Sequence, residues 1–163
     1  MHNMKKQQQK IIESALKDLS EFLKNSNWFG REHEVITLFV LKFLRSYTNN
    51  KVLRLSQISI ESSVQQIKNK GKKLVNKDLV IWETPYGTVW DQHRKTTNIP
   101  LYILEWKVNN PQKCIHDIKW LKSYTAIYQN VIGYSCCAYI TDLRGIEFWK
   151  IQKSKITCHH KIL

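Results

Sequence analysis

The sequence has no apolar stretch of the roughly 18 to 20 residues that a transmembrane helix needs. Its polar start, residues 1–10, lacks the apolar segment and cleavage site of a secretory signal, and neither end carries a lipidation signal. The four cysteines form no CxxC pair, so we expect reduced, packed thiols and no disulfides. These absences predict a cytoplasmic protein that does not act at a membrane.

Acidic residues are also scarce, with 13 Asp and Glu against 26 Lys and Arg, which gives a net charge of +13. This excess predicts a polyanionic partner, because each phosphate neutralised by a basic side chain releases counterions. DNA is the expected partner and RNA the alternative. The basic stretch 68–77, with Lys70, Lys72, Lys73 and Lys77, is predicted to contact phosphates. Its alternative interpretation is a solvated turn between strands.

The chain has 163 residues, 42% of them hydrophobic, which is enough for one compact domain with a core and too little for two. We predict an N-terminal helix in 1–26, a core in 27–151 and a disordered or surface tail in 152–163.

Hydrophobic periodicity predicts alternating helices and strands. Helical spacing covers 10–23, 31–47 and 112–128, and strand-like runs cover 52–60, 78–82, 99–108, 131–140 and 146–151. This order predicts an α/β fold in which a mixed β-sheet is flanked by helices.

Glu105 and Lys107 are the first candidates for a functional site. They stand two residues apart in an otherwise apolar strand, so both side chains point to the same face of the sheet. Burying unpaired charge costs several kcal/mol at least. Either the two residues form a structural ion pair, or they belong to a site that stabilises the charges in another way.

Asp78 favours the second interpretation. It opens another apolar strand, and the Pro85–Gly87 turn folds that strand back toward Glu105. Two carboxylates that converge repel each other unless a proton or a cation lies between them. Mg²⁺ is the oxygen-seeking ion that one or two carboxylates bind together with phosphate. The alternative role for Asp78 is that of an ordinary residue at the start of a strand.

These residues resemble the PD-(D/E)XK nuclease superfamily, in motif and in order. Residues 78–81 (DLVI) are similar to its first-acid strand, and residues 104–108 (LEWKV) to its E-x-K strand. Residues 30–38 (GREHEVITL) are similar to the opening helix of the resolvase-like members, which supplies a further acid. Alignment of the hydrophobic run gives that position to Glu32, with Glu34 as the alternate.

The resemblance implies a restriction-endonuclease-like core and a Mg²⁺- or Mn²⁺-dependent endonuclease of restriction or repair type that leaves 5′-phosphate ends. Asp78 and Glu105 are then the metal ligands, Lys107 assists the attacking water, and Glu32 completes the site. Lys77 replaces the proline of the motif, which is not a ligand. Symmetric cleavage of a duplex calls for a homodimer.

The connection between the two acidic strands carries further candidates for nucleic-acid contact. Trp90, Arg94 and Lys95 lie in its polar part, where stacking on bases or contact with phosphates fits their chemistry. The charge alone also fits a non-catalytic nucleic-acid-binding module on the same fold. A protein-interaction domain without chemistry is the third hypothesis.

Overall fold

The computed structural model describes residues 2–49, 51–67 and 71–162. The helices are α1 (His2–Asn25), α2 (Glu32–Leu38), the π-helix η1 (Phe39–Leu44), α3 (Arg45–Tyr47), the short 3-10 helix η2 (Leu55–Gln57) and α4 (Pro111–Ile127). The strands are β1 (Ile58–Gln65), β2 (Leu74–Ile81), β3 (Tyr102–Val108), β4 (Ile132–Tyr139), β5 (Gly145–Gln152) and β6 (Lys155–His160).

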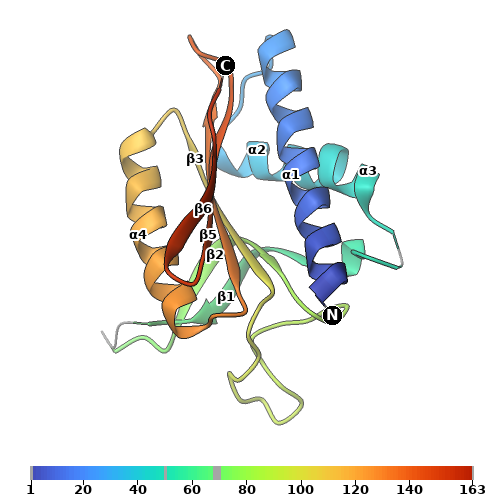
Figure 1. The fold of residues 1–163 in the computed structure, drawn as a ribbon, viewed down its shortest axis with the longest axis vertical. Helices are drawn as coiled ribbons and strands as arrows, with labels where there is room; N and C mark the ends of the chain where they lie inside the picture. Colours follow the sequence, from blue (N-terminus) through green and yellow to red (C-terminus); the bar gives the residue numbers. More distant parts are fainter. Residues whose placement is uncertain (1, 50, 68–70, 163) are drawn as a thin grey trace.

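The strands form one sheet in the order β1-β2-β3-β4-β5-β6, with α4 on one side and α1 together with the continuous segment α2–η1–α3 on the opposite side (Figure 1). All neighbouring strands are antiparallel except β3 and β4, which are parallel and are connected by α4. The predicted α/β class, with a mixed sheet flanked by helices, is therefore confirmed.

The helices cover the sheet through the apolar stripes that the sequence contains. The stripe of α1 is completely buried and consists of Ile12, Ala15, Leu16, Leu19 and Leu23. On the other face, the start of α4 is capped by Asn110, whose side chain accepts a hydrogen bond from the backbone N–H of Lys113 at 3.1 Å. Among the described residues, no helix combines the length and apolar character needed to cross a membrane.

The first two strands differ in extent from the prediction. The predicted strand 52–60 begins only at Ile58, because the buried side chain of Gln57 ties the preceding residues into a turn. Its amide accepts a hydrogen bond from Arg54 N at 2.9 Å and donates to Glu83 O at 2.8 Å. β2 in turn begins at Leu74, so Asp78 lies inside this strand and not at its start.

The predicted tail 152–163 is ordered over most of its length, since Lys155–His160 forms the largely exposed edge strand β6 against β5. The turn between them places Lys153 and Ser154 at φ values of 48° and 65°. Two consecutive left-handed residues are typical of a tight hairpin turn whose twist matches that of the strands. Neither residue is Asn or Gly, so the sequence carried no clear turn signal there.

Candidate active site

β2 and β3 separate just where the predicted acids lie. Their pairing covers Leu79 to Ile81 and Tyr102 to Leu104 and stops before Asp78 and Glu105. Beyond that point each carboxylate binds a backbone amide of the other strand: Asp78 N donates to Glu105 Oε2 at 3.3 Å, and Trp106 N donates to Asp78 Oδ2 at 2.7 Å. The structure therefore brings the two acids together in the fork between the strands.

Lys107 is surrounded by carboxylates from both sides of the sheet. Its Nζ lies 3.3 Å from Glu32 Oε1 on α2, 3.6 Å from Asp78 Oδ2 and 3.6 Å from Asp117 Oδ2 on α4. It also donates to the carbonyl oxygen of Trp106. Helices α2 and α4, which cover opposite faces of the sheet, thus each place one carboxylate beside the Lys107 ammonium group.

Sequence reasoning missed Asp117. The buried face of α4 consists of Cys114, Ile118, Leu121, Tyr124 and Thr125. Asp117 stands three residues after the first of these and four before the third, which places it on the same face. A carboxylate within a buried helical stripe was the signal that could have found it.

The structure also separates the two alternatives for the helical acid. Glu32 reaches Lys107, whereas Glu34 folds back on its own helix and accepts a hydrogen bond from Arg31 N at 2.6 Å. This contact belongs to a capping arrangement at the start of α2. Glu32 is therefore the residue that joins the cluster.

Lys77 belongs to the site, unlike Lys72 and Lys73, which are exposed. It is 8% exposed, and its Nζ donates to Glu105 Oε1. The same ammonium lies 3.5 Å from the centroid of the Trp120 ring on α4. Lys77 is thus held by a carboxylate and an aromatic face, which keeps it away from direct contact with a large ligand.

Burial and mutual repulsion shift the protonation of the acids. Burial raises the pKa of Glu105 to about 7, against the opposing effect of Lys77, and Asp78 adds to the rise. Burial likewise raises the pKa of Asp117, which Lys107 opposes. Burial alone would lower the pKa of Lys107, but Asp78, Asp117 and Glu32 outweigh it and raise the pKa. Lys107 therefore stays protonated at neutral pH.

This environment predicts how stability depends on pH in metal-free buffer. The folded pKa of Glu105 lies above its ordinary value of 4.5, so its contribution to stability is complete below pH 4.5 and is lost as the pH rises to about 7. The free energy of unfolding should fall by on the order of 3 kcal/mol over this range from this group. Urea denaturation in EDTA at several pH values measures this decrease in the free energy of unfolding.

Glu105→Gln should abolish the decrease, whereas Glu21→Gln, which changes an exposed acid, should retain it. Parallel pH profiles for all three proteins would contradict the prediction.

The cluster offers carboxylate oxygens, which are the kind of ligand that Mg²⁺ binds. Oδ2 of Asp117 is buried and makes no hydrogen bond within the described part of the chain, which leaves acceptor capacity pointing into the cluster. Among the described residues, no group of three or more His, Cys, Asp or Glu is arranged to hold a metal ion. Mg²⁺ needs fewer, because it is usually bound by one or two carboxylates together with substrate phosphates and water.

The other predicted nucleic-acid contacts lie away from this cluster. Lys72 and Lys73 are exposed just before β2, and Lys70 lies outside the described residues. Trp90 is 50% exposed in the segment 82–101, which projects from the end of the sheet where β3 begins (Figure 1). Arg94 and Lys95 are exposed in the same segment. The site residues near the end of β3 are not in contact with them.

Comparisons with protein-family models, curated proteins and solved structures gave no match to this chain.

Proposed function

We propose that this chain is a Mg²⁺-dependent nuclease of restriction or repair type, with a restriction-endonuclease-like core, that hydrolyses DNA phosphodiester bonds. The observation that carries the proposal is the position of the Lys107 ammonium, within 3.6 Å of Glu32, Asp78 and Asp117 and beside the fork that holds Glu105. Charges gathered in a partly buried site cost stability. Binding of a cation and a phosphate would explain why the chain keeps these charges together despite the loss of stability.

The residues of the cluster have distinct tasks in this proposal. Asp78 and Glu105 would hold the ion, Mg²⁺ or Mn²⁺, which when bound supplies a Lewis acid for the scissile phosphate and lowers the pKa of water. Lys107 donates hydrogen bonds toward the attacking water and the developing charge at phosphorus. Asp117 and Glu32 keep its ammonium in place.

The runner-up is a non-catalytic nucleic-acid-binding module. It is favoured by the net charge of +13 and by the lack of a preformed group of three metal ligands in the described residues. On this hypothesis the two lysines neutralise the acids, and the cluster only connects helices to the sheet.

Cleavage assays separate the two functions. Plasmid, branched DNA and RNA are incubated with the protein and Mg²⁺, Mn²⁺ or EDTA. We expect DNA to be cut with either metal, no cleavage in EDTA, and loss of cleavage in Glu105→Gln. DNA that is retained at moderate salt but left intact under every condition would support the module and contradict the nuclease.

A further inference from the structure

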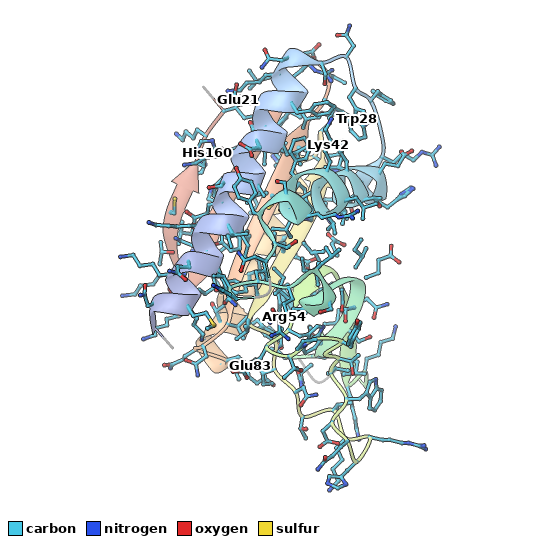
Figure 2. The ribbon with its side chains drawn as sticks, turned by 90° about the vertical axis from the view of Figure 1, so that its right-hand side faces the viewer. Glu21, Trp28, Lys42, Arg54, Glu83 and His160 are labelled. Carbon is cyan, nitrogen blue, oxygen red and sulfur yellow. The ribbon has the colours of Figure 1, made fainter. Side chains whose placement is uncertain are left out.

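A cavity lies about 20 Å from the cluster, estimated from the six residue steps between its lining residue Leu101 and Lys107 near the end of β3. It is a cavity of about 350 Å³ between the start of α1, the segment before β1 and the base of the projecting loop. Its lining residues include Lys5, Lys51, Arg54, Glu83 and Leu101. Figure 2 shows Arg54 and Glu83 together above this loop. The cavity shares no lining residue with the proposed nuclease site.

Buried amides fix the floor of the cavity. Gln8 donates to Val52 O at 2.8 Å and accepts from the hydroxyl of Tyr102 at 3.1 Å. Gln57 donates to Trp82 O at 2.9 Å and to Glu83 O at 2.8 Å. Both glutamines are almost completely buried, at 3% and 6% exposure. The side chains at the floor are therefore already ordered before a ligand binds, which lowers the entropic cost of binding.

The lining combines cations with apolar surface. Lys5, Lys51 and Arg54 bring three positive charges from two separate segments, against one carboxylate from Glu83. Lys5 also donates to Asn130 O at 3.2 Å, which holds its ammonium near the rim. The apolar part is formed by Met4, Val52, Pro85 and Leu101. A ligand with a negative group and a flat, weakly polar ring matches this combination.

An exposed aromatic ring stands next to the cavity. Tyr86 follows the lining residue Pro85, is 86% exposed, and has its backbone fixed at φ 57° by a hydrogen bond to Ser56 O at 2.6 Å. Backbone in this left-handed region is unusual for a bulky residue and is retained here with the ring directed into solvent. An exposed aromatic ring on a fixed backbone, beside cations, is a surface on which bases can stack.

The same chemistry continues along the loop. Asp91 holds the loop in shape by accepting hydrogen bonds from His93 N at 2.8 Å, Lys95 N at 2.9 Å and Thr97 Oγ1 at 2.9 Å. Trp90 precedes this turn and is half exposed. A polymer of nucleotides can occupy the cavity and the loop at once, whereas a small phosphorylated metabolite can use only the cavity.

We propose that this cavity and Tyr86 bind an unpaired nucleotide of a nucleic-acid strand, with the base on Tyr86 and the apolar wall and the phosphate on Lys51 and Arg54. The inference deepens the proposed function by naming its substrate class, DNA with a single-stranded segment. It rests on that function only for the link to cleavage, because binding to the cavity needs neither metal nor catalysis.

Fluorescence anisotropy tests the proposal in EDTA, with a labelled oligothymidylate of about 12 nucleotides and the full chain carrying Lys107→Ala. Adding Tyr86→Ala should weaken binding about tenfold. Adding Lys51→Ala should lower the slope of log affinity against log salt by about 0.7. Phe29→Ala removes another highly exposed aromatic ring, which is 73% exposed, and Lys17→Ala removes an exposed lysine on α1. Neither control should change the affinity as much.

Two results would overturn the proposal: equal affinities for the Tyr86→Ala, Lys51→Ala and control proteins, or thymidine monophosphate that binds as tightly as the oligonucleotide. Duplex DNA of the same length should bind more weakly than the single strand to the unaltered cavity, and tighter binding of the duplex would also contradict it. If the cavity does not bind the oligonucleotide, metal-dependent cleavage by the wild-type protein can still be observed. If the protein does not cleave DNA, the binding measured in EDTA still tests the cavity. The two proposals can therefore fail separately.

Discussion

In cleavage assays with Mg²⁺, Lys107→Ala is expected to cut DNA about a thousandfold more slowly than the wild-type protein. Lys107 is the cation nearest to the carboxylates of Asp78 and Asp117, at 3.6 Å from each. A preorganised donor aimed at developing negative charge typically contributes this much to a rate, since it acts in a site from which water is partly excluded. The measurement is the rate of plasmid nicking under single-turnover conditions.

The matched control is Lys113→Ala, which removes an exposed lysine from the start of α4 and changes the net charge equally. It should cut within about threefold of the wild-type rate, because a lysine outside the site affects cleavage only through phosphate binding. Lys107→Arg tests geometry, since a planar guanidinium replaces a compact ammonium. Equal rates for Lys107→Ala and Lys113→Ala would remove Lys107 from the proposed chemistry.

Lys107→Ala also has a consequence that does not depend on activity. Without the ammonium, the three acids around it repel one another, and a divalent cation relieves that repulsion. Mg²⁺ should therefore raise the Tm of Lys107→Ala by more than it raises the Tm of the wild-type protein, as measured by differential scanning calorimetry. An equal increase would show that the Lys107 ammonium does not compete with the ion, and no increase in either protein would argue against a cation site at this cluster.

The parts of the site that follow from local geometry could be predicted from the sequence. The alternation of side chains along a strand places Glu105 and Lys107 on one face. A charged pair in an apolar strand is also conspicuous, because burying charged groups costs free energy. The partners of these residues depend on tertiary structure. Lys77 pairs with Glu105 because β2 and β3 diverge, and Asp117 reaches Lys107 because of how α4 crosses the sheet. The spacing along α4 places Asp117 on the buried face of the helix, but no spacing along the chain tells which strand residue Lys77 or Asp117 meets.

The choice between Glu32 and Glu34 shows the same limit. Both acids stand in the first turn of α2, and the hydrophobic run alone could only rank them. Their positions at the start of the helix distinguish them. Glu34 accepts a hydrogen bond from the backbone N–H of Arg31, and Glu32 accepts one from Lys107. An acid that caps its own helix is thus a poor candidate for a distant site, and the capping acid is identified only when the start of the helix is known.

Trp106→Ala is expected to lower the free energy of unfolding by about 3 to 5 kcal/mol, the usual cost of emptying a large buried aromatic site. Trp106 is completely buried, on the face of β3 opposite Glu105 and Lys107, and its ring centroid lies 5.0 Å from that of Phe39. Phe39 directly follows α2, the helix that presents Glu32. The substitution should therefore loosen the helix on one side of the sheet and the lysine environment on the other.

Trp106→Phe is the informative comparison. The indole N–H of Trp106 is buried without a hydrogen-bond partner among the described residues, so phenylalanine removes a costly donor while it keeps a ring against Phe39. We expect a loss of no more than about 2 kcal/mol for Trp106→Phe, measured by urea denaturation followed by far-UV circular dichroism. If Trp106→Ala costs less than about 1 kcal/mol, the packing that joins α2 to β3 is not what holds Glu32 near Lys107. A core residue with no contact to substrate would then have no influence on the site, and the acids would have to be positioned by their ion pairs alone.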